Sequence, residues 1–128
     1  MRVCLLALAC SVVLLPRFIA ADEGKPIGPA EAAGKVNEQV TVEMEVKAAT
    51  TRGSVCFLNS EEDFKNPKNF TLFIDKDALA KFKEAKIDDP SAHFKGKLVR
   101  AQGKVVLYQN RPEIKLGSPD DIKIVEKK

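Results

Sequence analysis

Residues 96–116 constrain the fold of this chain more than any other segment, because they combine a long alternating pattern with a very short turn. Their sequence is GKLVRAQGKVVLYQNRPEIKL. Apolar and polar side chains alternate along residues 97–108, which predicts a long strand with one buried face. Gln109-Asn110 can reverse the chain, since asparagine tolerates left-handed backbone, and residues 111–116 then form a second strand. We therefore expect a β-hairpin near the C-terminal end of a mostly β domain.

Gly103 interrupts the longer of these two strands. A glycine in mid-strand suggests a bulge or a sharp bend, which strands need at the corners of barrels. Pro112 restricts the second strand to an edge position or places the residue near a strand start. The alternation puts a set of small and apolar residues on one face, namely Val99, Ala101, Gly103, Val105 and Leu107.

Three further strands are predicted upstream of the hairpin. Residues 40–46 alternate Val, Thr, Val, Glu, Met, Glu and Val, the period of a strand with one buried face. Residues 50–53 are expected to turn, with Gly53 free to take a positive φ, and residues 54–59 form the second strand. A charged loop then leads to a third strand at residues 70–74.

The pattern changes at residues 75–86, where Leu79 and Phe82 fall on one helical face and alanines favour helix. Asp75 or Asp77 is a candidate N-cap. Pro90 ends the helix, because the residue before proline is pushed out of the α region. Three strands, one helix and two strands is the element order of the OB-fold. The predicted fold class is therefore mainly β, a five-stranded, partly open barrel with one helix between strands three and four.

Several short runs also resemble one group of exported bacterial OB-fold domains. These runs are VCFLN at 55–59, FTLFI at 70–74, GKLV at 96–99, YQNRPEI at 108–114 and Ser118-Pro119. Some members of that group stand alone after a signal peptide, and others are accessory modules of extracellular sugar-nonspecific nucleases. The resemblance spans about residues 29–125. It implies the fold, and it brings no catalytic residues, because the nuclease chemistry belongs to other domains.

The N-terminal end is typical of a secretory signal peptide. Arg2 precedes an apolar run, and Ala20 and Ala21 are small residues suited to cleavage. We expect residues 1–21 to be the signal, 22–28 a flexible leader and 29–128 the domain, exported to the periplasm or beyond the cell, with no stable membrane span after cleavage. Losing residues 1–21 removes Arg2 and Arg17 and no acid, so the net charge falls from +3 to +1.

The residues offer little for catalysis. Cys56 is the one cysteine outside the signal and lies in an apolar run, as expected of a small buried hydrophobe. His93 is the single histidine. No spacing of His and Cys matches a metal site, and no phosphate loop or nucleophile motif is present. We therefore expect a protein that is not an enzyme, with no catalytic residue, metal or cofactor.

A binding module is the better hypothesis, and single-stranded nucleic acid or another polyanion is the expected partner. Such ligands need aromatic platforms and cationic side chains. The candidate ligand-binding residues are Arg52, Phe57, Phe73, Arg100, Lys104, Tyr108 and Arg111. Phe57 and Phe73 have an alternative, because a small barrel also needs its few large residues in the core.

Two other partners fit the same fold. OB-folds also bind oligosaccharides, and an open barrel leaves edge strands to which a partner protein can add a strand. Glu113 has two possible roles. It can pair across the hairpin with Arg100 or Lys104, or it can line a ligand groove together with Arg111.

Overall fold

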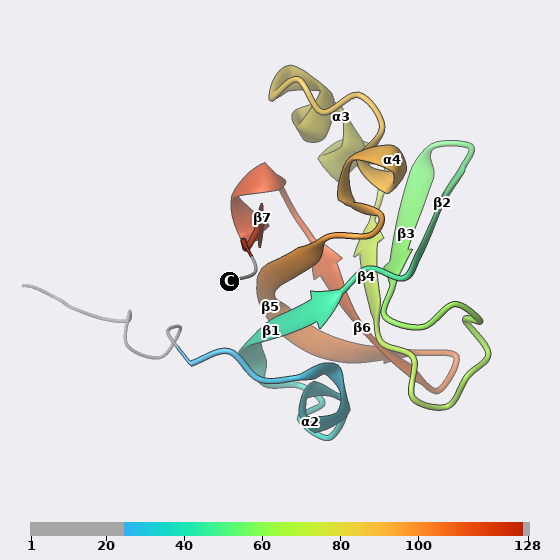
Figure 1. Cartoon of the computed structure of the whole chain (residues 1–128), viewed down its shortest axis with the longest axis vertical. Helices are drawn as coiled ribbons and strands as arrows, with labels where there is room; N and C mark the ends of the chain where they lie inside the picture. Colours follow the sequence, from blue (N-terminus) through green and yellow to red (C-terminus); the bar gives the residue numbers. More distant parts are fainter. Residues whose placement is uncertain (1–24, 127–128) are drawn as a thin grey trace, which may run out of the picture.

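The structure, a computed structural model, describes residues 25–126, and within this range seven strands form one mixed sheet (Figure 1). The strands are β1 (Gln39–Glu45), β2 (Ala48–Arg52), β3 (Val55–Asn59), β4 (Thr71–Ile74), β5 (Leu98–Tyr108), β6 (Arg111–Leu116) and β7 (Ile122–Ile124). Their order across the sheet is β1-β5-β6-β4-β3-β2, and β7 pairs with β5. The two outermost strands, β1 and β2, are joined by Val46 and Lys47 alone, so the sheet curls into an open barrel.

The pairing agrees with the expected OB-fold-like, mainly β architecture. Every pair along the sheet is antiparallel except β4 with β6, which run parallel. The expected count of five strands is wrong. A strand that was not expected, β2, follows β1, because residues 50–52, predicted as part of a turn, pair with β3. The chain reverses at Gly53, whose φ of +60° is the positive value expected there. The short strand β7 adds the seventh.

The helix expected over residues 75–86, between the third and fourth predicted strands, is present, but a second helix that was not expected follows it there. The four helices of residues 25–126 are α2 (Pro29–Ala33), α3 (Lys76–Glu84), α4 (Pro90–Phe94) and the 3-10 helix η1 (Pro119–Asp121). Asp75 caps α3 as predicted, accepting from the Ala78 N–H at 2.9 Å. The expectation that Pro90 ends this helix is wrong, because α3 already ends at Glu84 and Lys86 turns the chain with a φ of +72°. Pro90 instead begins α4, where its missing N–H is tolerated. Figure 1 shows α3 and α4 at one end of the curled sheet and α2 at the other.

Gly103 marks the corner of the barrel, as its position in mid-strand predicts. β5 pairs with β1 as far as Lys104 and with β6 from Val105 onward. A Cβ added at Gly103 would lie 2.5 Å from Ile114 Cγ2, so the close approach of β6 leaves no room for a side chain. The β5–β6 turn also forms at the two residues expected, with φ of +52° at Gln109 and +66° at Asn110.

The core fills the inside of the curled sheet and the end under α3 and α4. Its fully buried larger side chains include Val42, Val46, Leu58, Phe70, Leu72, Ile74, Phe82, Val99, Val105, Ile114 and Leu116. Cys56 is fully buried, as expected, and burial raises the pKa of its thiol to about 11. Leu107 was expected on the buried face and is 52% exposed. β1 ends opposite Lys104, so the end of the hairpin extends beyond the barrel.

Candidate functional site

A groove of about 300 Å³ lies on the outer face of the sheet, where β2, β3, β4 and β6 run side by side. The loop of residues 60–70 and the β5–β6 turn form its rim and lie together at the lower right of Figure 1. The residues that line the groove are Thr50, Arg52, Phe57, Asn59, Phe64, Asn69, Thr71, Tyr108, Gln109, Arg111 and Glu113. It therefore contains four of the predicted binding residues, Arg52, Phe57, Tyr108 and Arg111.

Phe57 and Phe73 form the aromatic part of this face. They are paired across β3 and β4, their ring centroids are 5.3 Å apart and their planes are tilted by 39°. Both rings are half-buried on the outer side. The alternative that they belong to the core is wrong, because strand alternation turns their neighbours Leu58 and Leu72 inward instead. Phe73 lies beside the groove rather than in its lining.

Three polar side chains form a hydrogen-bonded floor beneath the groove. Asn69 Nδ2 donates to Asn59 Oδ1 at 3.3 Å and to Thr71 Oγ1 at 3.1 Å. Thr71 Oγ1 in turn donates to Asn59 Oδ1 at 2.8 Å. The Glu61 N–H donates to Asn69 Oδ1, which holds the Asn69 amide in this orientation. Asn59 and Asn69 are buried, at 8% and 6% exposed.

Glu113 supplies the acidic side of the groove. β6 places it next to Thr71 of β4 and Val106 of β5. It is half-buried, and burial raises the pKa of its carboxyl group, while the charge of Lys115 partly opposes this shift. Its predicted pairing with Arg100 or Lys104 does not form, because the register sets Val106 opposite it. The other predicted role, lining a groove together with Arg111, is what the structure shows.

The rim carries the positive charge and additional rings. Arg111 Nη1 donates to the Phe64 carbonyl oxygen at 3.0 Å, and the guanidinium carbon lies 5.2 Å from the centroid of the Phe64 ring. This contact links the β5–β6 turn to the loop of residues 60–70. Tyr108 is 60% exposed and Phe64 is 53% exposed. Arg52 is exposed at the end of β2.

Arg100 and Lys104 lie elsewhere, on the part of β5 that pairs with β1. The Arg100 Nε atom donates to Glu43 Oε1 at 2.7 Å, forming an ion pair across these two strands. Lys104 is exposed opposite Gln39. The predicted set of seven residues is therefore divided between two sides of the barrel.

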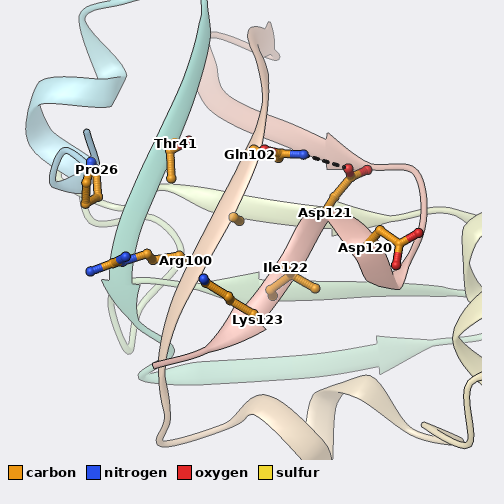
Figure 2. A pocket seen from close by; sticks show the side chains of 9 residues that line it. Pro26, Thr41, Arg100, Gln102, Asp120, Asp121, Ile122 and Lys123 are labelled. Carbon is orange, nitrogen blue, oxygen red and sulfur yellow. Dashed lines mark hydrogen bonds between the residues drawn. The ribbon is translucent and has the colours of Figure 1, made fainter. Parts of the chain in front are cut away.

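A second hollow, of about 290 Å³, adjoins Arg100 (Figure 2). It is lined by Pro26, Thr41, Arg100, Ala101, Gln102, Asp120, Asp121, Ile122 and Lys123. Three of its polar side chains have partners within the protein, since Arg100 pairs with Glu43 and Gln102 and Asp121 bind each other. Gln102 Nε2 donates to Asp121 Oδ1 at 3.5 Å, the dashed line in Figure 2, and Asp121 Oδ2 accepts from the Gly117 N–H at 3.0 Å.

Asn59, Asn69, Thr71 and Phe64 were missed as site residues at the level of sequence. A usable signal was present for two of them, since Asn59 and Thr71 occupy outward positions of strands where apolar neighbours point inward. Phe64 and Asn69 belong to a charged loop with no periodic pattern. No group of three or more His, Cys, Asp or Glu side chains within residues 25–126 is arranged to hold a metal ion.

Comparison with solved structures identifies the fold. The chain superposes on an aspartyl-tRNA synthetase of Leishmania major with a TM-score of 0.54 at 12% identity, covering 89% of this chain and 23% of that one. The asparaginyl-tRNA synthetase of Pyrococcus horikoshii gives 0.54 at 14% identity, over 81% of this chain and 24% of that one. The OBody AM1L10, solved bound to hen egg-white lysozyme, gives 0.50 at 17% identity, over 91% of this chain and 100% of that one.

The chain thus spans about a quarter of the length of the synthetases that it matches. No protein-family model and no curated protein matches the sequence. These findings support the OB-fold. They give no support to the finer resemblance to exported nuclease accessory modules. Within residues 25–126, no helix has both the length and the apolar character that crossing a membrane requires.

Proposed function

We propose that this chain is an exported, non-enzymatic module that binds single-stranded nucleic acid across the outer face of β3, β4 and β6. The observation that carries the proposal is the meeting of Phe57 with Arg52 and Arg111 in one groove, with the Phe73 ring packed against Phe57 beside it. Aromatic rings stack on bases of any sequence, and a guanidinium matches the geometry of a phosphate. The groove supplies both kinds of contact side by side.

The position of the groove on the fold supports the same ligand. OB-folds bind oligonucleotides across their second and third strands, which correspond here to β3 and β4. The solved structures of similar fold include enzymes named for their action on tRNA. After removal of the predicted signal the net charge is only +1. We therefore expect weak binding that depends strongly on salt.

The test is fluorescence anisotropy of labelled single-stranded DNA and RNA with residues 22–128, at low and high salt. We expect binding at about micromolar protein at low salt, lost as salt is raised. Replacing Arg52 and Arg111 together with alanine should abolish binding and leave the melting temperature nearly unchanged, because both side chains are exposed. The charge-matched control is Lys81→Ala with Lys83→Ala on the far helix α3, which should bind normally.

Two results would reject the groove as the site. Binding that survives the double arginine substitution is one of them. The other is a larger loss on replacing Arg100 and Lys104, which would place the ligand on the β1 side of the barrel. No binding of any oligonucleotide at low salt would reject the nucleic-acid reading and leave oligosaccharide or protein ligands.

A protein ligand is the second candidate, on one observation. Three large apolar side chains are more than half exposed near the β5–β6 turn, namely Phe64, Leu107 and Tyr108. A neighbour of the same fold, the OBody, is solved with a protein bound. Addition of a partner's strand to an exposed edge is another route to the same kind of complex. Pull-down from the exported fraction, compared between the wild type and Leu107→Ser, would test this candidate.

A further inference from the structure

The floor of the groove carries a donor that no group in the described part of the chain accepts. The Glu61 N–H requires an oxygen at Asn69, so Asn69 turns its Nδ2 toward Asn59. Asn59 must then present its oxygen, which accepts from both Asn69 and Thr71. The amide orientation of Asn59 is therefore determined by its neighbours. Its Nδ2 makes no hydrogen bond with any other group of residues 25–126, although Asn59 is only 8% exposed and lines the groove.

The carboxylate of Glu113 lies two strands away from Asn59, at the same register position of the sheet. Asn59 pairs with Thr71, and Thr71 pairs with Glu113. Neighbouring strands are about 4.8 Å apart, so the Cα atoms of Asn59 and Glu113 are separated by roughly 10 Å across the groove. No side chain within residues 25–126 forms an ion pair with Glu113, and its oxygens accept no hydrogen bond there. The groove thus offers two unused acceptor atoms on one side and an unused donor on the other.

The charge of Glu113 decides which part of a nucleotide can lie above the line of Asn59, Thr71 and Glu113 side chains. A carboxylate repels a phosphate, and burial in the groove strengthens the repulsion. The arginines that suit phosphates stand at the rim instead, at Arg52 and Arg111. A strand bound by those arginines would therefore direct a base, and not its backbone, toward Glu113. Phe57 lines the same groove and supplies a ring for that base to stack on.

We propose that Asn59 and Glu113 form a base-reading subsite for an unpaired guanine, a refinement that rests on the nucleic-acid function proposed above. Guanine is the natural base whose pairing edge carries two adjacent N–H donors, at N1 and N2, and these match the two oxygens of one carboxylate. Its O6 accepts, and it would face the Asn59 amide donor. The subsite reads the Watson–Crick edge, as proteins do for unpaired bases.

The other bases fit the same atoms less well. Uracil and thymine have one N–H between two carbonyl oxygens, and those oxygens would oppose the Glu113 carboxylate. Adenine and cytosine offer one amino group beside a ring nitrogen that accepts, which leaves one carboxylate oxygen unsatisfied. An unmatched buried polar group lowers affinity, so the donor pattern discriminates among the bases.

The experiment compares oligo-dT carrying one central guanine with the same strand carrying hypoxanthine, adenine or cytosine, by anisotropy at low salt with residues 22–128. Hypoxanthine lacks the N2 amino group alone. We expect the guanine strand to bind about tenfold more tightly than the adenine and cytosine strands, with hypoxanthine between them. The preference should weaken as the pH falls toward 4.5, because a protonated Glu113 loses one acceptor.

Glu113→Gln should remove the guanine preference while plain oligo-dT still binds, and Glu84→Gln on α3 is the charge-matched control that should keep it. Melting curves of both variants verify folding. Equal affinity for all four strands would overturn the subsite and leave the nucleic-acid function standing. Failure to bind any strand would overturn both. A guanine preference that persists in Glu113→Gln would overturn the assignment of this carboxylate.

Discussion

The two hollows of this barrel are nearly equal in size, but they differ in how their most buried or central polar groups are satisfied. The hollow beside Arg100 measures about 290 Å³ and the groove on the outer face about 300 Å³. In the former, Arg100 is paired with Glu43 and Asp121 accepts from Gln102 and Gly117. In the groove, the Asn59 amide donor and the Glu113 carboxylate have no hydrogen-bond partner among residues 25–126.

This difference matters more than volume or charge count. Groups that already bind one another gain little from a ligand, since each new contact replaces an existing one. A buried donor or acceptor without a partner pays a desolvation penalty that a ligand can relieve. Substitutions in the groove should therefore affect ligand binding more than substitutions in the hollow beside Arg100.

The largest expected effect is the unfolding of the domain by a substitution in β5, the strand that the two regions share. β5 passes from the hollow to the groove side, and Val105 is fully buried just after its corner. Val105→Asp places an unpaired charge in the core and should unfold the domain. Circular dichroism and thermal melting would show it. A soluble variant that still melts cooperatively would mean that the buried face of β5 is assigned wrongly. The separation of the two hollows would then be wrong as well.

A smaller effect is expected from removing a ring in the groove. Phe57→Leu keeps an apolar side chain but removes the stacking surface, and should weaken single-stranded nucleic acid binding by about tenfold, since base–aromatic stacking contributes about 1–3 kcal/mol. Arg100→Gln, in the other hollow, is the control and should leave affinity unchanged in anisotropy titrations. Equal losses in the two variants would remove the distinction between the regions.

The smallest effect concerns stability, and its sign should differ between the two regions. Burial raises the pKa of Glu113 above its ordinary value of 4.5. The folded state therefore holds the proton more tightly than the unfolded chain, and the stability this gives is present below about pH 4.5 and lost as the pH rises through the folded pKa. Glu113→Gln should thus stabilise the protein slightly at pH 7 and hardly at pH 4.

Glu43→Gln is the counterpart in the hollow. It removes a partner of Arg100 in an ion pair that is partly exposed, so it should lower stability at pH 7 by less than about 1 kcal/mol. Urea unfolding at pH 4 and pH 7 measures both variants. A loss of stability at pH 7 in Glu113→Gln would show that its carboxylate has a favourable partner in the folded protein.

Most of the strands were predictable because the alternation of apolar and polar residues that marks a strand is visible over a few consecutive residues. The alternation along residues 40–46 identifies Val42, Met44 and Val46 as buried, and Gly103 identifies the corner of β5. The same reasoning failed where a strand leaves the barrel. Leu107 fits the alternation perfectly and is still exposed, since no part of β1 reaches that far.

The candidate site was predictable only in part, for a related reason. Residue type identified Arg52, Phe57, Tyr108 and Arg111 as suited to a polyanion, and all four line one groove. Residue type equally suggested Arg100 and Lys104, which the strand order places on the side of β1. Alternation along a strand says which residues share a face. It does not say which strands lie next to each other.

Short stretches of the sequence are sufficient to predict strands, a helix cap, a two-residue turn and an OB-fold-like order of elements, because each of these depends on a few consecutive residues. The floor of the groove rests on pairs far apart in the chain. Asn59 meets Thr71 through the β3–β4 register, and Thr71 meets Glu113 through the parallel β4–β6 pair. A shift of either register by one residue would turn these side chains to the opposite face. Their meeting is therefore a property of the folded sheet.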